Sequence, residues 1–102
     1  MKITHKILPQ NNEYFSRLGE NIKLARLRRK LTTVQMAERS GLSRSTVFQI
    51  EKGSPTVAMG SYFSVLSVLN LEESITKIAF DDQYGRMLQD IGLNKHKTYK
   101  QE

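Results

Sequence analysis

The sequence contains no cysteine, and this absence excludes disulfide scaffolds, thiolate metal sites and cysteine nucleophiles. It also lacks an apolar run long enough for a signal peptide or a membrane-spanning helix, so we expect a cytoplasmic protein with no membrane partner. Acidic residues are in the minority, because ten Asp and Glu oppose sixteen Lys and Arg, for a formal net charge of +6. This balance favours a polyanionic partner such as nucleic acid, although a merely soluble basic protein would share it.

No catalytic or cofactor-binding constellation is visible either. The glycines stand alone, so they form no glycine-rich phosphate loop. His5 and His96 lie far apart in sequence and have no second ligand at metal spacing. The acidic pairs at 72–73 and 81–82 are better explained by a solvated face and a helix cap than by enzymatic carboxylates. We therefore expect no enzyme activity, no metal and no cofactor.

The 102 residues are enough for one compact domain with short tails. Residues 1–12 end in a turn-forming stretch after Pro9 and are expected to form a flexible arm. Residues 13–93 are expected to form the domain. The polar, basic segment 94–102 has no hydrophobic periodicity and is expected to be disordered. Since no segment is convincing as a strand, the predicted fold class is all-α.

Periodicity and capping signals divide the domain into helical segments. Thr32, with Gln35 three residues later, predicts a capping box. Gly41 suits a left-handed turn, and Ser43 is expected to cap the next helix, which stops before Gly53. The expected segments are 13–30, 32–40, 43–52, 59–70, 72–80 and a short last helix at 83–91.

Two sets of apolar residues carry further expectations. The first forms a wide stripe on the fourth segment, which is therefore expected to be mostly buried. Its members are Met59, Tyr62, Phe63, Val65, Leu66 and Leu69. The second set lies beyond the fifth segment and forms either a protein interface or a face that packs back on its own domain. Its members are Phe80, Tyr84, Met87, Leu88 and Ile91.

The segment from Leu31 to Gly53 has the features of a helix-turn-helix, in which two short helices flank a glycine-containing turn. Ala37 is small enough for the helices to approach each other. Val47 and Ile50 would anchor the second helix and leave its outer face free to enter a major groove. A helical hairpin without DNA function would show the same periodicity, but the turn, the capping and the positive charge favour DNA.

The outer face of the second helix carries side chains suited to reading DNA bases. Arg44 can form a bidentate contact with guanine, and Phe48 can contact a thymine methyl. The candidate base contacts are Arg44, Ser45, Phe48 and Gln49. Hydroxyl groups and backbone amides at the helix N-terminus suit phosphates. The candidate phosphate contacts on this helix are Ser43, Thr46 and Lys52.

This segment resembles the helix-turn-helix of the lambda-repressor-like family, also called Xre-type or Cro-type, over roughly 18–71. The resemblance lies in Arg26, Thr32, Ala37, Gly41, Ser43, Ile50, Glu51 and Gly53. It implies a compact five-helix DNA-binding domain, here with a short extra C-terminal helix. It also implies a partly buried structural ion pair between Arg26 and Glu51. The family often has glutamine at Thr33, where the side chain meets a phosphate, so Thr33 is a further phosphate candidate with a shorter reach.

The second half of the chain, at 53–72 and 80–90, resembles the HipB-type antitoxins. That resemblance implies an operator-binding repressor of its own operon, which also restrains a HipA-type serine/threonine kinase toxin. A homodimer on a palindromic operator agrees with this, because one recognition helix reads only a few base pairs of double-stranded DNA. Two alternatives stay open: a phage- or restriction-control-type Xre regulator without a toxin, and a protein-only adaptor that binds a kinase.

Overall fold

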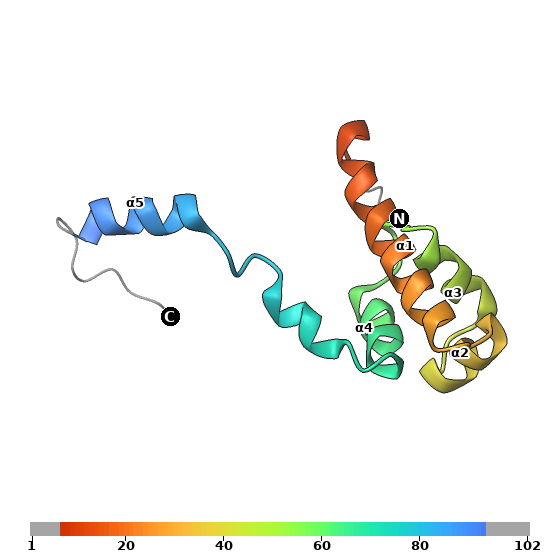
Figure 1. Ribbon diagram of the computed structural model, residues 1–102. Coiled ribbons are helices and arrows are strands. Elements are labelled where there is room, and N and C mark those ends of the chain that lie inside the picture. The colour runs from red at the N-terminus through yellow and green to blue at the C-terminus, as the bar shows by residue number, and fades with distance from the viewer. Residues whose placement is uncertain (1–6, 94–102) are drawn as a thin grey trace.

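The computed structural model describes residues 7–93, and every regular element in that range is helical (Figure 1). The elements are the 3-10 helix η1 (Pro9–Asn11), α1 (Asn12–Arg28), α2 (Thr33–Ser40), α3 (Arg44–Glu51), α4 (Met59–Val68), the 3-10 helix η2 (Glu72–Lys77) and α5 (Gln83–Leu93). The predicted all-α class is confirmed. Part of the expected N-terminal arm, at 1–6, and the expected disordered tail at 94–102 lie outside the described residues.

Side-chain caps start both helices of the helix-turn-helix, as the sequence predicted. Thr32 Oγ1 accepts from the backbone N–H of Gln35 at 3.0 Å, and Gln35 Oε1 accepts from the N–H of Thr32 at 2.9 Å. This reciprocal pair is the expected capping box. Ser43 Oγ accepts from the N–H of Thr46 at 3.1 Å and so caps α3. Between the helices, Gly41 has a φ of 73°, which is the predicted left-handed turn.

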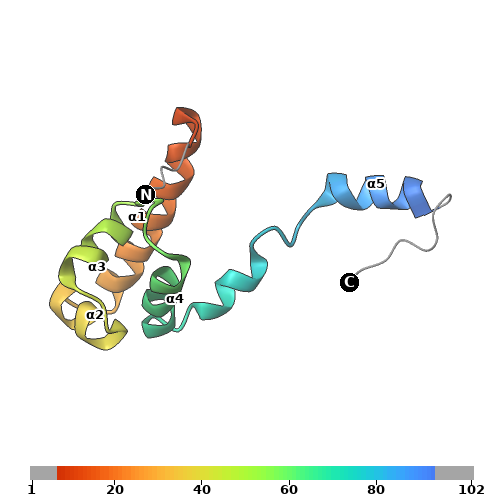
Figure 2. The same cartoon turned by 180° about the vertical axis from the view of Figure 1, so that it is seen from behind.

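The hydrophobic core is shared by the first four α-helices. Figures 1 and 2 show α3 beside α1; α2 packs against both α3 and α4, and η2 packs against α4. The buried apolar residues are Ile22, Ala25, Leu31, Met36, Ala37, Val47, Ile50, Tyr62, Val65, Leu66 and Leu69. Because every one of these helices contributes to this cluster, the orientation of α3 is set by the packing of the whole bundle.

Two glycines allow α1 to cross the C-terminal end of α3 at close range. A Cβ atom on Gly19 would lie only 2.6 Å from the carbonyl oxygen of Glu51. Gly53 has a φ of 79°, and a Cβ there would overlap the backbone of Phe15. A larger residue at either position would push the two helices apart. The sequence gives no sign that Gly19 permits this close approach, because the contact joins segments more than thirty residues apart.

The structure corrects the expected ends of four segments. Helix α4 ends at Val68 before Asn70, which has a left-handed φ of 63°, and α5 continues to Leu93. The first helix stops at Arg28 rather than Lys30, because Lys30 takes a left-handed φ of 57°. The fifth segment is a 3-10 helix that ends at Lys77, not an α-helix to Phe80. It stops there because Ile78 is extended and Ala79 has a φ of 64°.

The expectation that the apolar stripe of α4 is mostly buried is confirmed for four of its six members, and the other two are exposed. Met59 is 67% exposed and Phe63 is 42% exposed. The buried side of α4 is formed instead by Tyr62, Val65 and Leu66, so Met59 and Phe63 lie at its edge. Helical spacing identified the apolar residues, but the position of the neighbouring helices decides which of them are covered.

Helix α5 extends away from the bundle (Figures 1 and 2). Asp82 caps it as expected, since its Oδ1 accepts from the N–H of Gly85 at 3.0 Å. The five apolar residues at its start and along it do not pack back on their own domain in this structure, because all remain about half exposed or more. They are Phe80, Tyr84, Met87, Leu88 and Ile91.

We expect Gly19→Ala to lower the free energy of unfolding by about 1–3 kcal/mol, because the added methyl group overlaps the backbone of α3. Urea denaturation followed by circular dichroism measures this loss. Gly60→Ala is the matched control, since a Cβ at Gly60 meets nothing within 4 Å and alanine favours the helix. Equal midpoints for the two variants would show that α1 and α3 do not need the close approach.

Candidate nucleic-acid interface

Helix α3 has a buried side, which anchors it in the core, and an exposed outer face. Val47 and Ile50 are fully buried in the core. The four candidate base contacts all lie on the exposed side of the same helix, and they are Arg44, Ser45, Phe48 and Gln49. Phe48 is 60% exposed, so its ring is open to a binding partner. The face is thus available to a major groove without any rearrangement of the core.

The first turn of α3 combines an ordered cap with backbone donors. Ser43 Oγ and Thr46 Oγ1 lie 2.9 Å apart, so these two phosphate candidates also hydrogen-bond to each other. The N–H of Val47 donates to the carbonyl of Ser43. The first N–H groups of a helix have no acceptor within the helix. The Thr46 N–H donates to the cap, and the N–H groups of Arg44 and Ser45 remain for an outside acceptor. Such a helix end is a suitable place for a phosphate oxygen.

The C-terminal end of α3 carries a pair formed by two further candidates. The Lys52 ammonium lies 5.3 Å from the centre of the Phe48 ring, which is within the range of a cation–π interaction. Lys52 is exposed and follows the last helical residue. The positive charge of Lys52 thus lies beside the Phe48 ring, which is the candidate contact for a thymine methyl. Phe48 itself lies one helical turn after Arg44.

Thr33 differs from the other phosphate candidates in its position and exposure. It is the first residue of α2 and is half-buried, while the capping hydroxyl at this helix end belongs to Thr32. Its short side chain therefore has less freedom to reach a phosphate than the exposed residues of α3. The structure keeps Thr33 at a helix N-terminus, beside backbone donors that also suit phosphate.

A buried ion pair ties α3 to α1. Arg26 Nε lies 2.7 Å from Glu51 Oε2, and Arg26 Nη2 lies 3.1 Å from Glu51 Oε1. Arg26 Nη1 also donates to the carbonyl of Leu31 at 2.8 Å. Both charged side chains are only 8% exposed. The two guanidinium nitrogens satisfy both carboxylate oxygens of Glu51. Because Glu51 is the last residue of α3, the pair fixes this helix against α1, which is a structural role.

The loop after α3 is held by one hydrogen bond. The Tyr62 hydroxyl of α4 donates to the carbonyl oxygen of Ser54 at 2.5 Å. Burial raises the pKa of Tyr62 above its ordinary value, so the phenol stays protonated and keeps this donor at physiological pH. The contact fixes the chain as it leaves Gly53 and thereby supports the end of α3.

A family model for helix-turn-helix proteins matches residues 22–74, which is more than half of the chain. The chain belongs to the lambda-repressor-like helix-turn-helix family. It is a DNA-binding transcription regulator of that family. The match includes α2, α3 and α4, while α5 lies beyond it. A comparison with curated proteins finds no match.

Every Lys and Arg that the structure describes in this helix-turn-helix protein is exposed, except Arg26. Five of them lie on α1 or in the turn that follows it, and they are Arg17, Lys23, Arg28, Arg29 and Lys30. Within residues 7–93, no group of three or more His, Cys, Asp or Glu could hold a metal ion. In the same range, no helix is both long and apolar enough to cross a membrane.

Glu51→Ala is expected to lower the free energy of unfolding by about 3–5 kcal/mol, because it leaves the buried Arg26 guanidinium without its counter-ion. Urea denaturation checks the loss. The double variant Arg26→Met with Glu51→Leu removes both charges and should be more stable than Glu51→Ala. A double variant at least as unstable as the single one would contradict this account of the pair.

Proposed function

We propose that this protein is an operator-binding repressor that binds a palindromic operator as a homodimer and blocks transcription sterically. The observation that carries the proposal is the exposed outer face of α3, whose polar, cationic and aromatic side chains match the donors, acceptors and methyl groups of a major groove. Arg44, Ser45, Phe48 and Gln49 would set the sequence specificity. The proposed phosphate contacts are Thr33, Ser43, Thr46 and Lys52.

The proposed division of labour follows from position along α3. Arg44 and Ser45 are in the first turn, where a recognition helix enters the groove, and both are exposed. Lys52 lies after the last turn and contributes charge without base information. Loss of a base contact should therefore change which DNA sequence is preferred. Loss of a phosphate contact should lower the affinity for all DNA sequences by a similar factor.

We expect Arg44→Ala to weaken operator binding by about 1–3 kcal/mol and to relax the preference at one base position in each half-site. Competition gel shifts with single-base operator variants measure both effects. Lys77→Ala is the matched control, since it removes the same charge from an exposed site on η2, outside the helix-turn-helix. Equal losses for the two variants would mean that Arg44 contributes only charge.

We also propose that the repressor is the antitoxin of a HipA-type serine/threonine kinase. The support is the resemblance of 53–72 and 80–90 to HipB-type antitoxins. Co-expression with a kinase encoded beside the gene tests this. A stable complex that lowers the kinase's toxicity supports the antitoxin role, while a neighbourhood without such a kinase favours an Xre-type regulator alone.

A further inference from the structure

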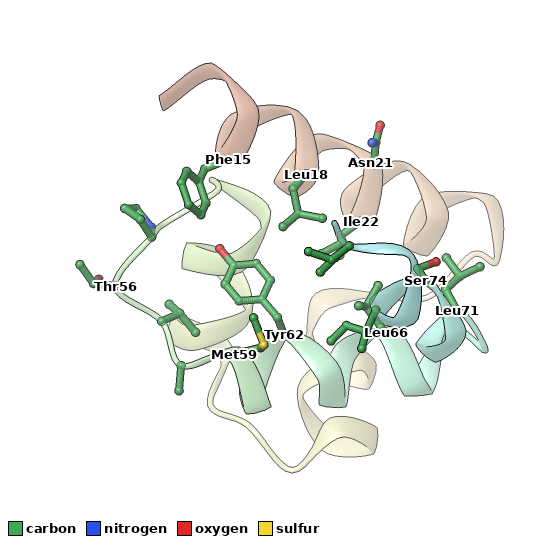
Figure 3. Close-up of a pocket in the computed structure, with 15 residues that line it drawn as sticks. Phe15, Leu18, Asn21, Ile22, Thr56, Met59, Tyr62, Leu66, Leu71 and Ser74 are labelled. Atoms are coloured by element: carbon green, nitrogen blue, oxygen red, sulfur yellow. The ribbon is translucent and has the colours of Figure 1, made fainter. Parts of the chain in front are cut away.

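An open apolar groove lies between α1, the loop after α3, α4 and η2 (Figure 3). Its volume is about 660 Å³, and none of its lining residues is charged. Three of the lining side chains are substantially exposed: Leu18 is 38%, Met59 67% and Ile78 64% accessible. One quarter of the residues in this protein are charged. An uncharged groove of this size therefore suits an apolar occupant and does not suit DNA.

Helix α5 has an apolar face that is exposed among the residues the structure describes. Tyr84, Met87, Leu88 and Ile91 follow helical spacing, and their exposed fractions run from 48% to 67%. An isolated helix of 11 residues is marginal in water, because nucleation is costly and few hydrogen bonds form. Helix α5 therefore gains stability only when this face packs against a surface.

The linker before α5 directs the helix away from its own groove. Ile78 lies at the groove, and α5 begins only five residues later. Arg86 of α5 holds the linker through Asp81 Oδ1 at 3.0 Å and through the carbonyl of Phe80 at 3.5 Å. For α5 to fill its own groove, the chain would have to reverse direction within residues 79–82 and give up these contacts.

We propose that the groove of each protomer receives the apolar face of α5 from a second copy of this chain. The inference rests on the homodimer in the proposed function and names the surfaces that form it. An exchange in both directions is a closed two-fold arrangement, in which each α5 meets an identical groove. A stable interface buries on the order of 1,200–2,000 Å² in total, and the two-fold exchange doubles the area that a single helix-in-groove contact would supply.

This arrangement is compatible with DNA binding. None of the residues that line the groove belongs to α2 or α3. Docking at the groove therefore leaves the outer face of α3 uncovered in both protomers. A two-fold dimer of this kind offers two recognition helices to two half-sites.

Sedimentation of the full chain without DNA tests the proposal with one variant on each surface. Leu88→Glu places a charge on the α5 face, and Met59→Glu places one in the groove. Met59 is exposed and begins α4, where an acidic residue favours the helix, so the domain should stay folded. Each change occurs twice per homodimer, so each should weaken dimerisation about a hundredfold or more.

Matched controls place the same charge beside each surface. Gln89→Glu lies on the opposite side of α5 from the apolar face, and Gly60→Glu follows Met59 but does not line the groove. Both control variants should dimerise as the unchanged protein does. Ile78→Glu provides a second groove variant at an exposed position and should behave as Met59→Glu does.

Mixing the Leu88→Glu and Met59→Glu proteins gives the decisive result. A mixed dimer has one contact with both changes and one contact with neither, so the mixture should dimerise more strongly than either variant alone. Three results overturn the proposal: an unchanged protein that is monomeric at all concentrations, a Met59→Glu variant with undiminished dimerisation, or a mixture without rescue. The second result would indicate pairing of α5 with α5. Because no DNA is present, a failure here is distinct from a failure of operator binding.

Discussion

The seating of the C-terminal end of α3 against α1 is the contact on which the DNA-binding surface depends. Gly19 allows the two backbones to approach, and Gly53 lets the chain turn away beneath Phe15. The ion pair between Arg26 and Glu51 then fixes the angle, since a fork-shaped guanidinium accepts a carboxylate in few geometries. The net stability gained from a buried pair is small, but breaking it is costly. Its main effect is therefore to define one orientation of α3.

That orientation assigns different tasks to the two ends of a helix of only eight residues. Its last residue is buried in the contact with α1, whereas its first turn is exposed, capped by Ser43 and supplied with free backbone donors. The domain is small and its core is shared by four helices, and α3 packs against both α1 and α2. A rigid recognition helix loses little conformational entropy on binding, which favours discrimination between similar base sequences.

Local chemistry made some features of the fold predictable from the sequence. The capping box at Thr32 and the turn at Gly41 are encoded within a few residues, so the sequence alone located α2 and α3. The ion pair came from the family resemblance, because its partners are separated by 25 positions. The role of Gly19 and the exposure of Met59 were not predictable, since each depends on which helix arrives beside it. The structure shows that the candidate base contacts are exposed, and their contacts with DNA stay predictions.

The central claim is that an exposed, preorganised α3 reads a specific operator. The most direct measurement is a gel shift with footprinting on the DNA upstream of the protein's own gene, with scrambled competitor and a salt series. We predict retention that survives competitor, two symmetric protected half-sites about one helical turn apart, and an affinity that falls linearly with salt on logarithmic axes. If scrambled DNA competes as well as operator DNA and no footprint forms, the claim is contradicted. The positive charge would then produce only non-specific DNA binding.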